Sequence, residues 1–300
     1  MSAQFKIKAA DPASVVRLER ELGLPRFIAA TLVARGIDNP AAVHRFLAPS
    51  LERDWLDPYI IPGLSDVADA LEAAVKRGDH ILVFGDFDLD GISATTVLTR
   101  GLRALGAQAT PFIPLRFEEG YALSQAAITR ACSFGPDFIV TVDCGIACKA
   151  EAAAVVEAGL GLAITDHHEP VDLVPEGVPV ADPKCDANCP SSILAGVGVA
   201  LKLVQVLGGR LGQPHLWRDF TDFATLGTVA DLMPMRDENR ALVSDGIARM
   251  NAAPRPCIAA LLATSGAADK PVSATNLSFS VIPRLNAAGR MGDAQLALDL

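Results

Sequence analysis

The chain has 300 residues, of which 50% are apolar and 20% are charged, and its formal net charge is −9 at pH 7. This composition predicts a large buried core and excludes an intrinsically disordered chain. The acidic balance also excludes a protein that holds duplex DNA through a broad basic face, so any contact with nucleic acid must be local. The length suits one large domain or two unequal ones.

The N-terminal part of the chain predicts a helical lead-in. Asp11 and Pro12 supply the side-chain cap and the first-turn proline of a helix, and Gly23 is the residue that ends it. Two further short helices are expected over residues 25–34 and 40–47. The stretch that follows, up to residue 62, is rich in proline and aromatic residues and is predicted to be a connector.

From residue 65 onward, apolar runs with strand character alternate with helical stretches. Strands are expected over residues 80–84, 109–113, 138–142, 160–164 and 178–181, and helices over residues 66–76, 92–105, 124–132 and 148–158. This alternation predicts an α/β fold with a mostly parallel sheet and helices on both of its faces. The C-terminal part should be helical, over residues 196–207, 216–228, 240–251, 256–264 and 293–300.

Acidic and imidazole side chains follow five apolar runs, at places where a strand is expected to end. They are Asp86, Asp88 and Asp90 after residues 81–84, Asp143 after residues 138–142, Asp166, His167 and His168 after residues 162–165, Asp182 after residues 178–181, and Asp231 after residues 226–230. Ligands bind at the carboxyl ends of parallel strands, where such side chains repel one another unless cations lie between them. An oxygen-rich set with a few imidazoles suits Mg²⁺ or Mn²⁺ and predicts metal-assisted phosphoryl chemistry.

Each of these segments also has a plainer interpretation. The triple aspartate resembles the start of an EF-hand calcium loop, but Val97 stands where that loop needs a glutamate, and a strand is predicted where it needs a helix. Two simpler structures also fit, namely a solvated turn for this segment and an ordinary helix cap for Asp143. His167 and His168 are adjacent in a chain with only five histidines, which favours one ring as a metal ligand and the other facing substrate.

Three arginines are candidates for binding phosphate. Arg116, after the second predicted strand, is either a surface arginine paired with Glu118 or Glu119, or a clamp that binds phosphate with two hydrogen bonds. Arg284 and Arg290 flank a predicted loop that contains an asparagine and a glycine. Such a loop suits an anion site, with a helix cap as the alternative.

Other patterns exclude several classes of protein. No Gly-Lys pair occurs, which excludes a Walker A phosphate loop, and residues 196–200 lack the third glycine of a dinucleotide fingerprint. The six cysteines are expected to be reduced thiols and not zinc ligands. Residues 1–8 lack the apolar core of a secretory signal, and the longest apolar stretch, residues 194–207, is too short to span a bilayer. We therefore expect a soluble, cytoplasmic protein with no membrane partner.

In their order along the chain, these segments resemble the motifs of the DHH phosphoesterase superfamily and, within it, of the RecJ-like single-strand exonucleases. The matching segments are Gly85-Asp86-Phe87-Asp88-Leu89-Asp90-Gly91, Val142-Asp143-Cys144-Gly145-Ile146, Thr165-Asp166-His167-His168, Leu226-Gly227-Thr228-Val229-Ala230-Asp231 and Pro283-Arg284-Leu285-Asn286-Ala287-Ala288-Gly289-Arg290-Met291. The last of these, like residues 194–200, is typical of the RecJ-like branch. The resemblance runs from about residue 47 to the end of the chain.

The resemblance implies two bound ions of Mn²⁺ or Mg²⁺. The ligands it implies are Asp86, Asp88, Asp90, Asp143, His167 and Asp231. It implies catalytic roles for Asp88, Asp143, His167 and His168, with Asp143 bridging the two ions and His168 nearer the scissile phosphate. Arg116, Arg284 and Arg290 would hold phosphates of DNA. One departure is Ala122, which stands where the family often has a second glycine after Gly-Tyr.

The resemblance also implies a division of the chain: a helical N-terminal region over residues 1–62, a catalytic domain over residues 63–285, and residues 286–300 as the start of a helix leading to a missing C-terminal domain. The function it implies is a 5′-to-3′ exonuclease that hydrolyses single-stranded DNA in repair and recombination, with DNA-repair or single-strand-binding proteins as partners. Two alternatives are a phosphoesterase for short oligonucleotides, cyclic dinucleotides or pyrophosphate, and a non-catalytic scaffold that kept the fold.

Overall fold

The computed structural model describes residues 8–266, 270–290 and 294–300, with the side chain of Arg290 excepted. Its central element, within these residues, is a sheet of five strands that pair only in parallel, in the order β2-β1-β3-β4-β5. The strands are β1 (His80–Phe84), β2 (Gln108–Phe112), β3 (Phe138–Thr141), β4 (Gly161–Thr165) and β5 (Val180–Ala181). The parallel sheet predicted from the sequence is confirmed.

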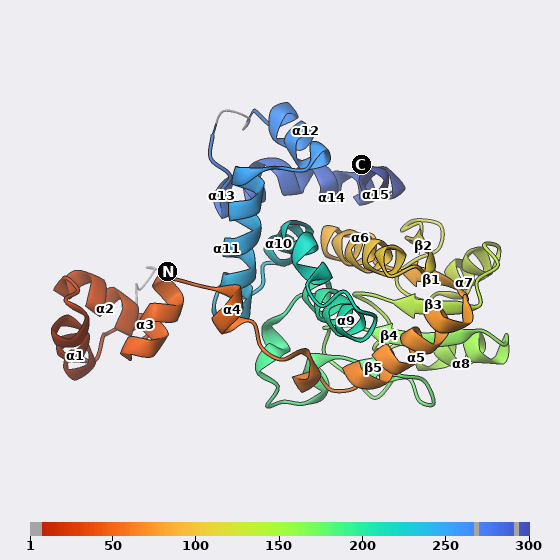
Figure 1. Cartoon of the computed structure of the whole chain (residues 1–300), viewed down its shortest axis with the longest axis horizontal. Coiled ribbons are helices and arrows are strands. Elements are labelled where there is room, and N and C mark those ends of the chain that lie inside the picture. Colours follow the sequence, from red (N-terminus) through yellow and green to blue (C-terminus); the bar gives the residue numbers. More distant parts are fainter. Residues whose placement is uncertain (1–7, 267–269, 291–293) are drawn as a thin grey trace, which may run out of the picture.

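Helices cover both faces of this sheet, as predicted (Figure 1). They are α5 (Leu64–Arg77), α6 (Leu89–Ala104), α7 (Gln125–Cys132), α8 (Lys149–Glu157) and α9 (Gly196–Arg210). Ile81 and Val83 of β1 belong to the same apolar core as α5, α6 and α9, whereas Leu82 and Phe84 belong to the core that α7 and α8 form on the other face. This is the two-residue period of a strand buried on both sides.

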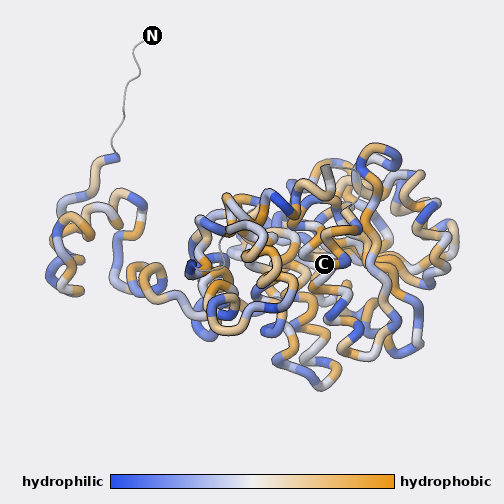
Figure 2. Tube along the Cα trace, turned by 90° about the horizontal axis from the view of Figure 1, so that it is seen from above, coloured by the Kyte–Doolittle hydropathy of each residue, from blue (hydrophilic) through white to orange (hydrophobic). Residues whose placement is uncertain are grey.

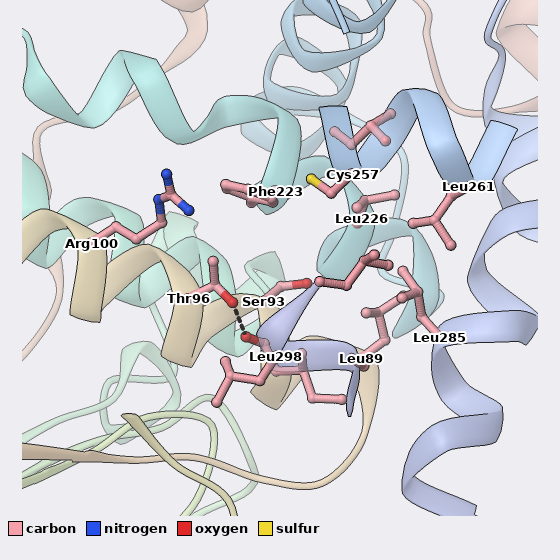
Figure 3. A pocket seen from close by; sticks show the side chains of 14 residues that line it. Leu89, Ser93, Thr96, Arg100, Phe223, Leu226, Cys257, Leu261, Leu285 and Leu298 are labelled. Atoms are coloured by element: carbon pink, nitrogen blue, oxygen red, sulfur yellow. Dashed lines mark hydrogen bonds between the residues drawn. The ribbon is translucent and has the colours of Figure 1, made fainter. Parts of the chain in front are cut away.

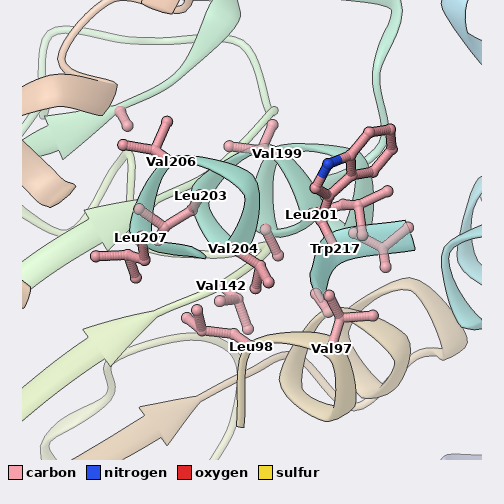
Figure 4. Packing of buried hydrophobic residues seen from close by; sticks show 14 of the residues in the cluster. Val97, Leu98, Val142, Val199, Leu201, Leu203, Val204, Val206, Leu207 and Trp217 are labelled. Atoms are coloured by element: carbon pink, nitrogen blue, oxygen red, sulfur yellow. The ribbon is translucent and has the colours of Figure 1, made fainter. Parts of the chain in front are cut away.

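Helix α9 lies at the centre of the larger core and is buried along most of its length. Figure 4 shows Val204 of this helix pointing toward Leu98 of α6 and toward Val142, the residue that follows β3. Trp217 closes the same core by stacking on Trp55, with 5.7 Å between the ring centroids. The core therefore includes the segment that precedes the sheet domain.

Side-chain caps explain where several of the helices begin. Helix α1 (Pro12–Leu22) has the predicted cap, because Asp11 accepts a hydrogen bond from the Ser14 N–H, and Gly23 follows in the left-handed conformation with φ of 65°. Helix α6 begins at Leu89, earlier than predicted, because Asp88 accepts hydrogen bonds from the first N–H groups of the helix. The triple aspartate is thus partly a loop and partly the first turn of a helix.

Two predictions are wrong. Residues 226–230 are not a strand but the second half of α10 (Thr221–Ala230), which follows the 3₁₀ turn η4 (Leu216–Phe220). Side chains on all sides of α10 are buried, so the run has no amphipathic period and resembles a buried strand. Arg284 lies in helix α14 (Ile282–Arg290), not in a loop.

The N-terminal helices form a small unit of their own. Helices α1, α2 (Arg26–Ala34) and α3 (Pro40–Leu47) enclose a separate apolar core that includes Leu18 and Leu32. Figures 1 and 2 both show this unit beside the sheet domain, joined to it by one segment of chain. That segment, predicted as a connector, contains α4 (Leu51–Asp54) and the 3₁₀ turn η1 (Pro58–Ile60). The unit therefore packs mostly within itself.

The C-terminal helices build a second layer on α6 and α10 around an apolar core. They are α11 (Asp237–Ala252), α12 (Pro256–Thr264), α13 (Ala274–Asn276), the π-helical turn η5 (Leu277–Val281), α14 and α15 (Gln295–Asp299). Two short 3₁₀ turns, η2 (Pro183–Cys185) and η3 (Pro190–Ile193), lie earlier in the chain, between β5 and α9. Figure 3 shows a small pocket of about 70 Å³ left in this packing, with Arg100 and Phe223 on one side of it. Within the described ranges, none of the helices combines the length and apolar character needed to cross a bilayer.

A buried ion pair joins α9 to α11. The side chains of Lys202 and Glu238 are both 0% exposed, and Lys202 Nζ donates to Glu238 Oε2 at 2.5 Å and to the carbonyl of Leu56 at 2.7 Å. Glu238 also accepts hydrogen bonds from the Leu56 N–H and from the hydroxyl of Ser191. Because both charges are hydrogen-bonded, the network ties the connector and the loop before α9 to the start of α11.

Replacing Glu238 with leucine should lower the free energy of unfolding by about 3–5 kcal/mol, because the change leaves the Lys202 charge buried without its partner. The control is Glu176→Leu, which breaks the pair between Lys149 and Glu176, whose side chains are 44% and 79% exposed. The control should cost at most about 1 kcal/mol. Urea denaturation followed by circular dichroism measures both, and equal costs would contradict a structural role for the buried pair.

Candidate metal centre

The six side chains predicted as metal ligands converge at the carboxyl ends of the strands. Three of them come from the segment after β1, one follows β3, one follows β4, and the last is the residue that ends α10. They are Asp86, Asp88, Asp90, Asp143, His167 and Asp231. Asp231 therefore reaches the centre from a helix end, although the sequence predicted a strand end for it.

The imidazole of His167 lies between three carboxylates. Its Nε2 atom is 3.1 Å from Asp143 Oδ1, 3.6 Å from Asp231 Oδ2 and 3.7 Å from Asp90 Oδ2. The His167 side chain is only 5% exposed, so water screens these contacts weakly. Carboxylates from three separate segments are thereby held around one nitrogen atom.

The ligand atoms fall into overlapping groups, in each of which they lie within 4.8 Å of one another. Asp86, Asp88 and Asp143 form one group, and Asp90, His167 and Asp231 form another. Asp143 also lies in a third group together with His167 and His168. Asp143 and His167 therefore connect the groups, which is the arrangement expected of two neighbouring cation sites that share a carboxylate.

Asp90 is held in place by the start of α9. Its carboxylate oxygens accept hydrogen bonds from the N–H groups of Gly196 at 2.7 Å and Val197 at 3.0 Å. The positive end of the helix dipole thus faces a carboxylate that is almost fully buried. A Cβ atom at Gly196 would lie 2.3 Å from Asp143 Oδ1, so only glycine lets α9 approach the centre this closely.

Asp143 is both strained and buried. Its φ of 61° lies in the left-handed region, which non-glycine residues seldom adopt and which Asp and Asn tolerate best. Among the described residues, Asp143 Oδ1 and His167 Nδ1 are buried polar atoms without a hydrogen-bond partner. Burying such atoms is costly unless another group satisfies them, and a divalent cation suits the carboxylate oxygen. The donor set therefore fits a hard cation.

The pKa values of the carboxyl groups agree with that fit. Burial and then the charge of Asp88 raise the pKa of Asp86 to about 7. Burial, with the neighbouring carboxylates, raises the pKa values of Asp90, Asp143 and Asp231 as well. The folded chain alone thus disfavours the charged forms, and a bound cation reverses this balance because it stabilises carboxylates.

Asp166 does not join these groups but holds His168. Its carboxylate accepts a hydrogen bond from His168 Nδ1 at 2.7 Å and from the N–H groups of Ile146 at 2.9 Å and His167 at 2.7 Å. Burial opposes the charge of Asp166, but the His168 hydrogen bond and the other contacts lower its pKa. In turn, the hydrogen bond to Asp166 raises the pKa of His168 to about 9, so this half-exposed ring is an imidazolium at neutral pH.

Arg116 lies on the loop after β2, beside the centre. Its guanidinium stacks on the ring of Phe87, 4.6 Å from the ring centroid, and Phe87 is the residue between Asp86 and Asp88. The predicted alternative of a pair with Glu118 or Glu119 is wrong: no such ion pair forms among the described residues, and Glu119 pairs with Arg130. Arg116 is exposed and lies next to the segment of Asp86, Asp88 and Asp90, which we call the metal loop. On this loop Ala122, the departure from the family pattern, adopts a positive φ of 55°.

Helix α14 packs directly on the metal loop. The side chain of Asn286 accepts a hydrogen bond from the Leu89 N–H at 2.9 Å, and a Cβ atom at Gly289 would lie 2.3 Å from the carbonyl oxygen of Phe87. Arg284 is exposed and donates to the carbonyl of Ser280 in the preceding π-helical turn η5, and among the described residues no contact places it at the centre. The side chain of Arg290 lies outside the described residues.

The sequence predicted no role for Asp166 or Asn286, and it grouped Asp182 with the acidic side chains expected to converge at the strand ends. Asp182 is buried and caps η2 by accepting from the Lys184 N–H, and burial raises its pKa to about 6. It belongs to none of the ligand groups found in the described residues. Asp166 was visible in the sequence as a neighbour of the two histidines, whereas no local signal indicated the contact of Asn286.

Comparison with known proteins agrees with this geometry. Residues 80–228 match the family model of the DHH family, N-terminal domain. The single-stranded-DNA-specific exonuclease RecJ of Bacillus subtilis (strain 168) is 36% identical over 299 residues, which are 99% of this chain and 37% of that protein. Two crystal structures of RecJ from Thermus thermophilus are also similar.

The structure in complex with Mn²⁺ has a TM-score of 0.81 and 33% identity, and the match covers 97% of this chain and 41% of that one. The structure in complex with Mg²⁺ has a TM-score of 0.70 and 29% identity, over 97% of this chain and 38% of that one. The chain thus spans less than half the length of these relatives. With its ordered motifs, parallel sheet and convergent acidic centre, the chain contains a DHH-family domain over residues 80–228 and is RecJ-like in sequence and fold.

Proposed function

We propose that this chain carries the metal-dependent phosphodiesterase centre of a 5′-to-3′ exonuclease acting on single-stranded DNA. The observation that supports the proposal most strongly is the pair of ligand groups that meet at Asp143 and His167. The similarity to RecJ proteins supports the class of substrate and the exonuclease reaction. The direction of degradation is part of the proposal and rests on the family resemblance.

Two divalent ions, Mn²⁺ or Mg²⁺, are the cofactors that this donor set suits. Asp86, Asp88 and Asp143 would hold one ion, and Asp90, His167 and Asp231 the other, with Asp143 adjacent to both groups. When bound, the ions supply an activated water and stabilise the charge that develops on the phosphate oxygens. Crystal structures of the relatives in complex with Mn²⁺ and with Mg²⁺ support this choice.

The protein's own groups would orient the substrate and neutralise its charge. His168, kept protonated by Asp166, presents a cation at the edge of the centre and would donate a hydrogen bond or a proton to the leaving oxygen. Arg116, stacked on Phe87, would hold a neighbouring phosphate in a fixed position. Arg284 and Arg290 remain predicted phosphate ligands.

The cellular setting is proposed on the same basis. A RecJ-like exonuclease would act in the cytoplasm, in DNA repair and recombination. DNA-repair or single-strand-binding proteins are its expected protein partners, and single-stranded DNA is the partner that the relatives' names support directly. The division of the chain at residues 62 and 285 also remains a prediction.

Asp143→Asn should abolish hydrolysis and raise the stability of the metal-free protein, because burial and the neighbouring carboxylates disfavour the charged form of Asp143. Asparagine matches the volume of aspartate and tolerates a positive φ, so the fold should persist. Release of mononucleotides from 5′-phosphorylated single strands in Mn²⁺ measures the first effect, and thermal unfolding in chelator measures the second.

Asp66→Asn, which alters an exposed carboxylate on α5 that has no ion pair among the described residues, is the matched control for both assays. It should leave the rate and the metal-free stability unchanged. Normal cleavage by the Asp143→Asn variant would show that Asp143 is not a metal ligand. Lower stability of the metal-free variant would contradict the claim that the buried centre disfavours the charged form of Asp143.

Asp166→Asn should lower the pKa of His168 from about 9 toward 6.5. The hydrogen bond from His168 to the charged Asp166 carboxylate is the largest cause of the raised pKa, and the variant removes that charge. If hydrolysis needs the imidazolium, the alkaline limb of the pH–rate profile should move down in step. Calorimetric affinity for Mn²⁺ should stay unchanged, because Asp166 lies in none of the ligand groups. An unmoved alkaline limb in a folded variant would exclude this role for His168.

Arg116→Ala should weaken the binding of single-stranded DNA and make its salt dependence shallower by about 0.7 in log–log slope, as expected for one lost phosphate contact. The control, Arg77→Ala, removes an arginine that pairs with Asp79 at the end of α5. Fluorescence anisotropy at several salt concentrations measures both variants. If Arg116→Ala and the control share the wild-type slope, Arg116 does not contact phosphate.

A further inference from the structure

A cleft of about 380 Å³ lies between the N-terminal unit and the segment that leads from α10 into α11. One wall comes from the corner between α2 and α3 and from α3 itself, and the other from the residues just before α11. The cleft is lined by Arg35, Gly36, Ile37, Ala42, Arg45, Phe46, Pro234, Met235, Arg236 and Asp237. It is separate from the residues of the metal centre.

The cleft is locally basic in a chain whose net charge is −9. Its lining contains Arg35, Arg45 and Arg236, all exposed, against the single carboxylate of Asp237. In the described part of the chain, Arg35 and Arg45 have no ion pair within 4.0 Å, and Arg236 reaches Asp237 only at 3.8 Å. These guanidinium groups are therefore available to an anion from solvent.

A fourth arginine, Arg240, packs against Phe46 of the cleft lining. Arg240 donates to the carbonyl of Phe46, and its guanidinium stacks on the Phe46 ring, 3.9 Å from the centroid. Burial and then the charge of Arg35 lower the pKa of Arg240, so the positive charge of Arg240 is disfavoured at this place. An anion between the two walls would stabilise that charge.

The cleft is connected to the metal centre by a short piece of chain. Asp231 belongs to one ligand group, and Arg236 lines the cleft. The step from Asp231 to Arg236 spans at most about 18 Å, so one single strand can reach both the metal centre and the cleft. Between them Leu232 is 86% exposed and has a positive φ of 57°, so an apolar side chain stands free on this path.

We propose that this cleft binds the sugar–phosphate backbone of the same single strand whose scissile bond lies at the metal centre. The inference rests on the proposed function and adds a binding site for nucleotides remote from the cleaved bond. Arginines that lack partners, beside an aromatic ring and an exposed apolar side chain, are the combination by which proteins bind single strands without reading their sequence.

The test compares the wild-type chain, the double variant Arg35→Ala/Arg45→Ala, and the control Arg20→Ala. Arg20 lies in the same N-terminal unit, its side chain is 77% exposed, and it is absent from the cleft lining. Binding of fluorescent oligothymidylates of about 16 and about 3 nucleotides is measured by anisotropy in chelator at several salt concentrations. Hydrolysis of the short strand is measured separately in Mn²⁺.

The wild-type chain should bind the long strand more tightly than the short one, and the double variant should lose about tenfold in affinity for the long strand only. Its log–log salt slope should become shallower by about 1.4, the value for two lost phosphate contacts on a single strand. Hydrolysis of the short strand should be unchanged, because neither substituted arginine belongs to the ligand groups of the metal centre. Arg20→Ala should match the wild type throughout.

Wild-type affinity and salt slope in the double variant would overturn the proposal, as would equal wild-type affinities for the two strands. A double variant that loses affinity for a polyglutamate peptide but not for DNA would show that the cleft docks an acidic protein, which also overturns it. Failure of the proposed function gives a different result: the wild-type chain would not hydrolyse the short strand in Mn²⁺, even if its binding of both strands were as predicted.

Discussion

The crowding of carboxylates around the His167 imidazole is the constraint on which the rest of the structure depends. Three separate segments bring Asp90, Asp143 and Asp231 within 4 Å of one nitrogen atom, in surroundings that raise the pKa values of these acids. The fold tolerates this through fixed backbone dipoles at Asp90, where the N–H groups that begin α9 face the carboxylate. What remains of the repulsion favours a bound cation.

Residues next to the metal centre, and residues further from it, hold its side chains in position. Next to it, Asp166 keeps His168 charged and oriented, and the left-handed backbone of Asp143 turns that carboxylate into the site. One layer further out, α14 presses on the metal loop through Asn286 and Gly289. A segment far along the sequence thus holds the first acidic motif in place.

Much of this could be predicted from the sequence, because the sheet obeys the simple rules of buried parallel strands. The ligands at strand ends follow from the alternation of strands and helices. Asp231 was placed on the wrong kind of element, because a helix buried on all sides has no amphipathic period. The contact of Asn286 with Leu89 and the cleft formed by Arg35 and Arg236 depend on packing between distant segments, which no local pattern encodes.

The most direct measurement is anomalous X-ray diffraction from crystals of this chain grown with Mn²⁺. The account predicts two anomalous peaks, one among Asp86, Asp88 and Asp143 and the other beside His167 and Asp231, with Asp143 in contact with both. A single peak that touches neither His167 nor Asp143, or side chains that turn away from the ions, would contradict the account of a shared two-ion centre.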